Sequence, residues 1–228
     1  MKAVILAAGK GARLRPLTDY VPKPLLDVGG APLITRTLMS LPRAVTEIHI
    51  VVGYMGEKIL TALGGHFAGR PIFYHQQETL NGTGGAMMLL KDVIDGPTLI
   101  LNADDLYSGD DLARLSEYPL AILAKERTRG TVPNPLSVRH GFLNGFARLP
   151  QHQYAPLENC GAYLVDKRYF SVPPAMIQVR DQMEYSLPHA FVELAKNELV
   201  SVVRATFWMP VGTPEQLAVA RDLVNLGR

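Results

Sequence analysis

The sequence predicts an α/β protein, a Rossmann-like three-layer αβα sandwich with a mostly parallel central sheet and a small antiparallel section in the second half. Three observations predict this fold. Short apolar, β-branched stretches recur through residues 1–125, amphipathic helical stretches separate the first of them, and the opening stretch runs directly into a glycine-rich turn. After residue 125 this alternation gives way to short stretches with turn signals, which predicts the antiparallel section.

The first half of the chain supplies the predicted parallel strands. The first is Lys2–Leu6, which leads into a turn that contains Gly9 and Gly11. Further apolar runs predict buried strands at Ile48–Val52, Ile72–Tyr74, Thr98–Leu101 and Leu120–Ala124. Because right-handed crossovers join parallel strands, ligand sites lie beyond the carboxyl ends of those strands. The functional residues are therefore expected in the loops at that edge.

The second half mixes strand and helix signals. The string Leu143-Asn144-Gly145 predicts a turn, and Gly161–Val165 has the pattern of a strand. Helical patterns occur at Met183–Lys196 and at Pro214–Leu226. Thr213 is the expected N-cap of the last helix, with a proline at its first position.

The composition predicts one domain that spans residues 1–228, with halves at 1–125 and 126–228. Hydrophobic residues make up 47% of the chain and charged residues 19%, which is typical of a globular protein with one continuous core. The 23 basic and 21 acidic residues give a net charge of +2 without runs of like charge, so nucleic acid is not an expected partner.

The opening segment and the cysteine content bear on location. The first apolar run is too short to span a membrane, so no membrane partner is expected. The single cysteine, Cys160, cannot form an internal disulfide, and the six histidines show no ligand spacing. A reducing, cytoplasmic location is therefore expected. The oligomeric state stays open, and a homo-oligomer is one option.

The first chemical motif is the glycine-rich loop after the first strand, followed by Pro22-Lys23-Pro24-Leu25. Glycines after a strand let backbone N–H groups approach phosphate oxygens, and Arg13 and Lys23 supply positive charge. The sequence has no Walker A string, and Leu14 stands where a dinucleotide fingerprint needs its third glycine. The loop therefore predicts a polyphosphate site of another type, to which Lys10 and Arg15 either contribute or add only surface charge.

This loop and the following segment resemble the signature of the sugar-phosphate nucleotidyltransferase family, LAAGxGxRxxPLT and then PKPL. The resemblance implies transfer of a nucleotidyl group from a nucleoside triphosphate to a sugar 1-phosphate, with release of pyrophosphate. It implies a nucleotide-binding first half and a sugar-binding second half. The implied catalytic residues are Arg13, on the β- and γ-phosphates, and Lys23, near the α-phosphate. The residues implied to surround the nucleotide are Leu6, Ala8, Gly9 and Gly11.

The second motif is the stretch from Gln76 to Met87. An amide can bind the donor and acceptor edge of a nucleobase, and glycines let the ring lie close to the backbone. The stretch is similar to the family's base-binding element, which implies that Gln77, Gly82 and Thr83 bind the base of UTP or dTTP. Asn81 occupies a place where the family often has Leu. In the alternative reading, Thr83 only caps a helix.

The third motif is Asn102-Ala103-Asp104-Asp105, which follows a predicted strand. Carboxylates at such a position are the hard oxygen ligands that Mg²⁺ prefers, so Asp104 and Asp105 are the candidate metal ligands. The family resemblance assigns the catalytic role to Asp104. In the other interpretation both aspartates only cap a turn.

The sequence departs from the family pattern at two places. Pro210 stands where relatives carry a second metal aspartate, in the string W-x-D-x-G-T, and we hypothesise that Asp105 substitutes for it. The family's second lysine, near the sugar phosphate, is absent, and Arg148 is the candidate to supply that charge. For the sugar, the resemblance implies Glu158, Asn159 and Glu184. A strand asparagine that satisfies backbone groups is an equal alternative for Asn159.

The mechanism implied is an in-line displacement at the α-phosphorus with no covalent intermediate. The nucleophile is already an anion, so the protein supplies alignment and charge compensation. Two alternatives remain. One is a CTP-dependent cytidylyltransferase that acts on choline phosphate, for which a cage of aromatic residues is expected. The other is a catalytically weakened nucleotide-binding relative, which the proline at position 210 favours.

Overall fold

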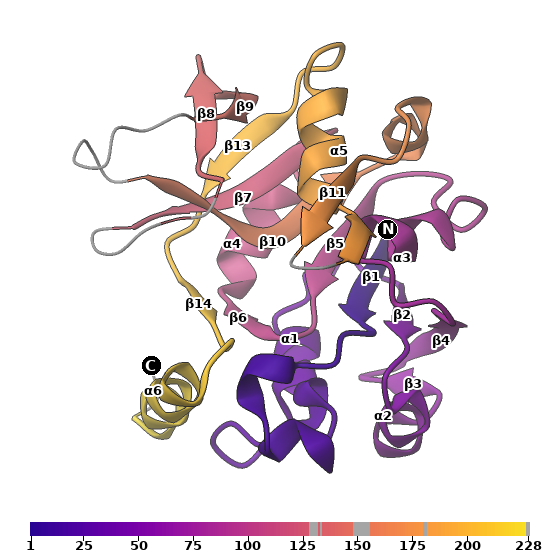
Figure 1. Ribbon diagram of the computed structural model, residues 1–228, viewed down its shortest axis with the longest axis vertical. Helices are drawn as coiled ribbons and strands as arrows, with labels where there is room; N and C mark the ends of the chain where they lie inside the picture. The colour runs from indigo at the N-terminus through magenta and orange to yellow at the C-terminus, as the bar shows by residue number, and fades with distance from the viewer. Residues whose placement is uncertain (128–131, 133, 148–155, 180–181, 227–228) are drawn as a thin grey trace.

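The computed structural model describes residues 1–127, 132, 134–147, 156–179 and 182–226. Within them, a central ten-stranded sheet has the order β3-β4-β2-β1-β5-β10-β7-β13-β9-β8 (Figure 1). Its strands are β1 (Lys2–Ala7), β2 (Glu47–Val52), β3 (His66–Phe67), β4 (Arg70–Gln76), β5 (Thr98–Asn102), β7 (Ala121–Glu126), β8 (Leu136–Arg139), β9 (Phe142–Phe146), β10 (Leu157–Val165) and β13 (Ser201–Arg204). All the strands predicted from apolar runs are present. The sheet contains strands from both halves of the chain.

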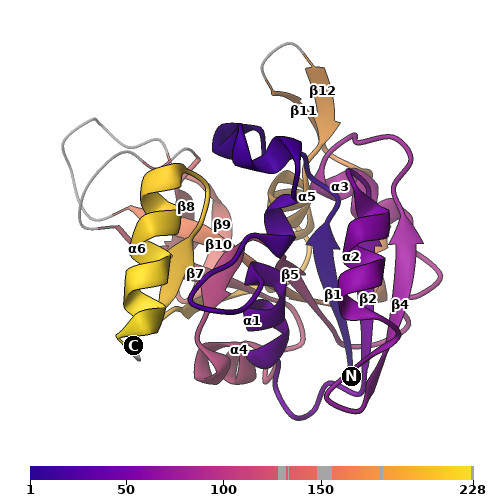
Figure 2. The same cartoon turned by 90° about the horizontal axis from the view of Figure 1, so that it is seen from below.

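Helices cover both faces of this sheet, as the three-layer prediction requires (Figures 1 and 2). One face packs against α1 (Leu33–Met39), α2 (Gly56–Leu63) and α4 (Gly109–Leu115). The other face packs against α3 (Thr83–Met88) and α5 (Leu187–Leu194). The C-terminal helix α6 (Pro214–Asn225) closes a third apolar cluster beside the first turns of the chain, and Thr213 caps it as predicted. The predicted fold class is therefore confirmed.

The antiparallel part of the second half lies within the central sheet. Strand β10 lies between β5 and β7 and runs antiparallel to both, while β7 and β13 are parallel to each other. Most residues of β10 are fully buried, which suits a strand covered on both faces and paired on both edges. The reversal places the start of β10 beside the carboxyl end of β5.

The predicted helix at Met183–Lys196 is wrong in its first residues. Strand β12 (Gln182–Tyr185) occupies them, and α5 begins only at Leu187. The Ser186 side chain accepts a hydrogen bond from the backbone N–H of His189, and Pro188 stands in the first turn. A serine cap followed by a proline fixes the start of a helix, and the residue before a proline disfavours helical backbone.

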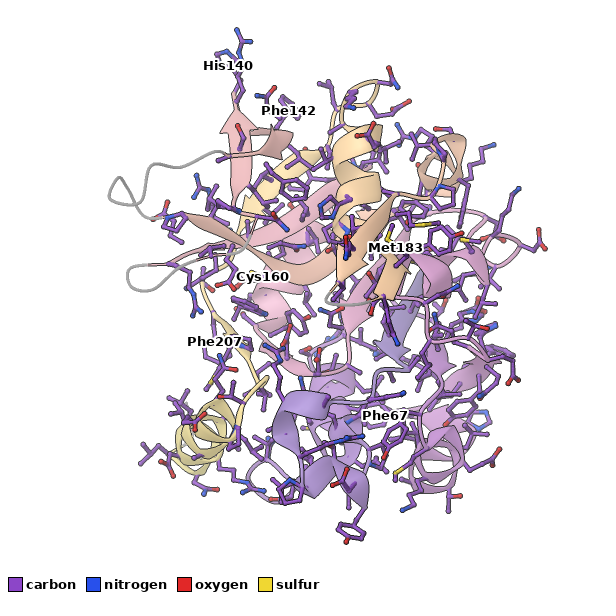
Figure 3. The ribbon with its side chains drawn as sticks, in the orientation of Figure 1. Phe67, His140, Phe142, Cys160, Met183 and Phe207 are labelled. Carbon is purple, nitrogen blue, oxygen red and sulfur yellow. The ribbon has the colours of Figure 1, made fainter. Side chains whose placement is uncertain are left out.

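Two small sheets lie outside the central one. Strand β11 (Met176–Val179) pairs with β12 to form a hairpin, and β6 (Asp105–Tyr107) pairs with β14 (Trp208–Pro210). Figure 3 shows Met183 on the hairpin and Cys160 inside the molecule, in agreement with exposures of 56% and 0%. The remaining regular segments are the short 3-10 turns η1 (Ala12–Leu14), η2 (Leu17–Asp19), η3 (Lys23–Leu25) and η4 (Lys167–Ser171). In the described part of the chain, we find no helix with the length and apolar character needed to cross a bilayer.

Candidate active site

The glycine-rich loop folds back on the segment that carries Lys23. Gly11 has a φ of +62°, and a Cβ built on it would lie 2.8 Å from the Cβ of Lys23. The hydroxyl of Thr18 donates to the carbonyl oxygen of Gly11 at 3.0 Å. A left-handed backbone with no room for a side chain requires glycine, so this residue fixes the shape of the loop.

Lys23 and Arg13, the two cationic side chains at this loop, differ in burial and in their contacts. The Lys23 ammonium is buried and donates to Asp104 Oδ2 at 2.5 Å, while the Asp104 side chain is 36% exposed. The exposed Arg13 lies against Gly212, where a Cβ would be 2.9 Å from its guanidinium nitrogen. Gly212 therefore makes space for Arg13 at the loop. Arg15 instead pairs with Asp19 at 3.0 Å.

These groups open into one cavity of about 650 Å³ at the carboxyl ends of β1 and β5. Most of the site residues predicted from sequence line it: Leu6, Ala8, Gly9, Gly11, Arg13, Lys23, Gln77, Gly82, Thr83, Asp104, Asn159 and Glu184. Lys10 is also in the wall, whereas Arg15, Asp105 and Glu158 are not. Predicted site residues that are far apart in the sequence, such as Leu6 and Glu184, thus face one space.

The candidate base-binding stretch, residues 76–87, packs against the hairpin. Gly82 has a φ of +93°, and a Cβ there would be 2.4 Å from the carbonyl oxygen of Tyr185. The Thr83 hydroxyl accepts a hydrogen bond from the backbone N–H of Leu187 at 3.1 Å, so it links α3 to the start of α5. The buried Gln77 donates from Nε2 to Asn81 Oδ1 at 2.9 Å and to the Gly82 carbonyl at 3.1 Å.

Asn159 makes the backbone contact of the structural alternative and also lies where a sugar-binding residue is predicted. Its Oδ1 accepts from the backbone N–H of Gly161 at 2.9 Å, and its Nδ2 donates to the Tyr163 hydroxyl at 2.6 Å. It also lines the cavity. Gly161 has a φ of +68° at a bulge between β10 and β7, and a Cβ there would clash with Asn102 at 2.1 Å. Burial raises the pKa of Tyr163 well above its usual value, so its hydroxyl stays neutral.

The two glutamates predicted for the sugar lie in different places. Glu184 is on β12 and lines the cavity, together with its neighbours Gln182 and Tyr185. Glu158 instead pairs with Arg127, with 2.6 Å between Oε2 and Nε. Burial raises the pKa of Glu158, and the nearby guanidinium opposes that shift. The structure therefore does not bring Glu158 into the cavity. Arg148 lies outside the described residues.

Asp105 faces away from the cavity wall into the small sheet. It pairs in register with Pro210, and its Oδ2 accepts from Trp208 Nε1 at 3.2 Å. Burial, with a further contribution from the charge of Asp104, raises the pKa of Asp105 to about 8. Its carboxyl is buried against Trp208 and absent from the cavity wall, so the predicted substitution of Asp105 for the missing metal aspartate is not supported by its position.

The donors fit a magnesium ion that arrives with a nucleotide, but not one held by the protein alone. Mg²⁺ is usually bound through one or two carboxylates plus substrate phosphates. Asp104 offers one carboxylate at the cavity, and the side chain of Pro210 has no oxygen that could bind a metal ion. Among the residues with assigned positions, no three or more His, Cys, Asp or Glu side chains gather to hold a metal.

Sequence reasoning missed several residues of the cavity wall. Tyr163, Ile177 and Gln182 line it without belonging to any of the quoted motifs, and Asn102 lines it although the third motif gave it no role. Alternation along β12, where Gln182 and Glu184 both face the cavity, is the signal that could have located the hairpin. The choline phosphate alternative gains no support, because the aromatic residues in the described wall are Tyr163 and Tyr185 alone.

Comparison with known proteins agrees with this geometry. The family model described as nucleotidyl transferase matches residues 2–132. The chain belongs to the nucleotidyl transferase family. This confirms the family resemblance inferred from the three motifs, and the match covers the phosphate loop, the base-binding stretch and Asp104.

Two relatives of this chain differ in length and in the activity that their names give. The bifunctional protein GlmU of Methanocaldococcus jannaschii is 32% identical over 94% of this chain and 52% of its own length. The chain thus spans about half the length of that relative. The N-acetylmuramate alpha-1-phosphate uridylyltransferase of Neisseria meningitidis serogroup B is 34% identical over 99% of both chains.

A solved structure supports the fold. The putative glucose-1-phosphate thymidylyltransferase of Bacillus anthracis superposes with a TM-score of 0.80 over 99% of this chain and 95% of its own. Its sequence identity is 22%, so the likeness concerns the fold of this nucleotidyl transferase and not its substrates.

Proposed function

We propose that this nucleotidyl transferase joins a nucleoside triphosphate, UTP or dTTP, to a sugar 1-phosphate and releases pyrophosphate. The observation that carries the proposal is the shared cavity, in which the phosphate loop, the base-binding stretch and the residues of β10 and β12 face one another. Relatives named as sugar-phosphate uridylyltransferases support it. A cytoplasmic location, where nucleoside triphosphates are available, is part of the proposal.

The phosphate loop binds the triphosphate. Backbone N–H groups near Gly9 and Gly11 face its oxygens, and Lys10 and Arg13 add positive charge at the same wall. Lys23, fixed by its ion pair with Asp104, stands beside the α-phosphate and stabilises the charge that develops on it. The loop thereby aligns the leaving pyrophosphate.

The acceptor side orients the sugar 1-phosphate. Asn159 and Glu184 face the cavity and offer polar groups to sugar hydroxyls. The acceptor's phosphate oxygen is already an anion, so no side chain is required as a general base. It attacks the α-phosphorus in line with the leaving group, and the protein contributes position and charge compensation.

Mg²⁺ belongs to this proposal as an ion that enters with the triphosphate. Asp104 is the residue that would hold it, and the ion would supply further neutralisation of the phosphate charge. We propose no direct role for Asp105, because its carboxyl is buried against Trp208.

A pyrophosphate-release screen tests the proposal. The purified full chain is incubated with UTP, dTTP, CTP, ATP or GTP against a panel of sugar 1-phosphates and choline phosphate, with and without Mg²⁺. Release of pyrophosphate with one pair that contains a sugar 1-phosphate, and only with Mg²⁺ present, is the expected result. Release with choline phosphate alone, or with no acceptor, contradicts it.

A second candidate function is favoured by one observation. Pro210 lies opposite Asp105, and Asp104 is the one carboxylate that the described residues place at the phosphate end of the cavity. A nucleotide-binding relative with very weak turnover would have this arrangement. Tight binding of a triphosphate without pyrophosphate release from any pair in the same screen would identify it.

A further inference from the structure

The side-chain amide of Gln77 has an orientation that its neighbours determine. Its terminal atom lies 3.1 Å from the carbonyl oxygen of Gly82, and a carbonyl oxygen only accepts hydrogen bonds. The atom that faces Gly82 must therefore be the NH₂ nitrogen, Nε2. This assignment follows from the chemistry of the partner and distinguishes the two ends of the amide, which are otherwise alike in shape.

Asn81 takes the second hydrogen of the same NH₂ group. Its Oδ1 accepts from Gln77 Nε2 at 2.9 Å. Both amide hydrogens of Gln77 are thus used, and the carbonyl oxygen Oε1 remains. No hydrogen bond to that oxygen comes from any residue with an assigned position, and Gln77 lines the cavity. The buried amide therefore presents an acceptor, and no donor, to a ligand.

Asn81 does not line the cavity but lies behind its wall. Its own contacts hold it in place there. Its backbone N–H donates to Thr79 at 2.8 Å, and its carbonyl accepts from the backbone N–H of Tyr185 at 2.7 Å. Its side chain occupies the space that a Cβ on Gly85 would fill, because such an atom would lie 1.7 Å from Asn81 Oδ1. These contacts fix the position of the Asn81 side-chain amide.

We infer that Asn81 is a positioning residue that holds Gln77 in the orientation that accepts a hydrogen bond from a nucleobase ring N–H. Uracil and thymine carry such a donor at N3, whereas the matching ring nitrogens of cytosine and adenine carry a lone pair. Two acceptors that face each other in a buried site leave both unpaired, which lowers affinity. The inference rests on the proposed function and narrows its substrate to bases with a ring N–H.

The test compares nucleotide binding by the wild type, Asn81→Leu and Asn81→Asp. The dissociation constants of UTP and CTP are measured by calorimetry with Mg²⁺ and without an acceptor, and their ratio is the readout. Leucine removes one of the two acceptors that hold Gln77 Nε2, so only the Gly82 carbonyl still opposes the amide rotation that would turn an N–H toward cytosine N3. Aspartate keeps an oxygen at the same place, so it is the matched control.

The expected result is that the wild type prefers UTP, that Asn81→Leu lowers the preference roughly three- to tenfold, and that Asn81→Asp retains it. The dissociation constant of GTP is measured as well, because guanine has a ring N–H but is larger than uracil. It therefore distinguishes the effect of the hydrogen bond from the effect of base size. Equal affinity of the wild type for UTP and CTP would overturn the inference. An unchanged ratio in Asn81→Leu would also overturn it.

A second variant displaces the Asn81 side chain without changing Asn81 itself. Gly85→Ala places a methyl group where Asn81 Oδ1 lies, and alanine is compatible with the helix α3 that contains it. We expect the same fall in base preference as with Asn81→Leu. A preference equal to that of the wild type, in a variant with the wild-type melting temperature, would contradict the inference.

These measurements separate the inference from the proposed function. Binding that depends on the base and on Asn81, without pyrophosphate release in the screen, supports the inference and rejects the transferase activity. Pyrophosphate release at equal rates from UTP and CTP supports the activity and rejects the inference.

Discussion

The proposed nucleotide side of the cavity and its proposed acceptor side are built in different ways. The nucleotide side comes from loops that directly follow the parallel strands β1 and β5 and the strand β4, and glycines with positive φ shape it at Gly11 and Gly82. The acceptor side comes from the antiparallel strand β10 and from a hairpin that pairs only with itself among the described strands. One side depends on local backbone shape and the other on long-range pairing.

This difference explains where variation is tolerated. Phosphate groups are the same in every nucleoside triphosphate, so a fixed backbone cradle suits them. The acceptor side holds its polar groups on side chains, such as Asn159 and Glu184, that a substitution can change without altering the sheet. Changes on the nucleotide side should therefore abolish turnover, and changes on the acceptor side should alter substrate preference.

The strongest test of this comparison is Lys23→Ala. We expect turnover to fall roughly a hundredfold or more, because one group that stabilises the transition state is lost. The fold should persist, since Asp104 remains partly exposed to water. Steady-state kinetics and circular dichroism measure the two effects. Lys10→Ala, which removes an exposed cation from the same wall, is the matched control and should cost much less.

Gly82→Ala probes the point where the two sides meet. The added methyl group would lie 2.4 Å from the carbonyl of Tyr185, on a backbone with a φ of +93°. We expect a loss of stability of about 1–3 kcal/mol and weaker binding of both substrates, because the hairpin must move. Gly96→Ala has no atom within 4 Å of the new methyl and should leave the melting temperature nearly unchanged. Equal melting temperatures for the two variants would contradict the contact.

A smaller effect is expected from Glu184→Gln on the acceptor side. The substitution keeps the size of the side chain but removes the charge that faces the cavity, so KM for the sugar 1-phosphate should rise by roughly tenfold. KM for the triphosphate should stay constant. Glu193→Gln, at an exposed ion pair with Lys196, serves as the control. An equal rise in both KM values would show that the two sides are not separate.

The smallest effect concerns pH and lies away from the cavity. Burial, together with the neighbouring His49, lowers the pKa of His75, and His49 also contacts Glu47 and stacks on Phe73. The unfolded chain then binds more protons than the folded one below a pH of about 6.5, so the free energy of unfolding falls as the pH drops through that range.

His75→Gln should flatten this slope. Melting temperatures between pH 5 and 7.5 measure the change, and His66→Gln on the exposed strand β3 is the comparison variant. Turnover should not change, because His75 is absent from the cavity wall. A slope equal to that of the wild type would show that His75 does not contribute to it.

The nucleotide side could be predicted from the sequence because its signals are contiguous. The loop from Leu6 to Lys23 and the stretch around Gln77 each place their groups within a few residues of a strand end. The acceptor side could not be predicted as well. The insertion of β10 between β5 and β7 depends on pairings between residues far apart, and no local pattern of β10 specifies its neighbours.

The errors have local causes as well. The helix expected from Met183 begins only at Leu187, after the cap residue Ser186. The apolar spacing of β12 also suits a helical period over so few residues, which explains the wrong prediction. Asp105, like Asp104, was a candidate metal ligand in the sequence. Its side chain turns into the pairing with β14, which only the tertiary structure reveals.

The reversed direction of β10 has a consequence for how this enzyme scaffold diversifies. Because β10 runs antiparallel to β5, the first residues of β10 lie at the carboxyl end of β5. Side chains such as Asn159 therefore reach the cavity directly from the strand. Mutations in this strand and in the hairpin can therefore accumulate while the opening loop of the chain stays unaltered. If the proposed function holds, evolution or a protein engineer can exchange one substrate and keep the other.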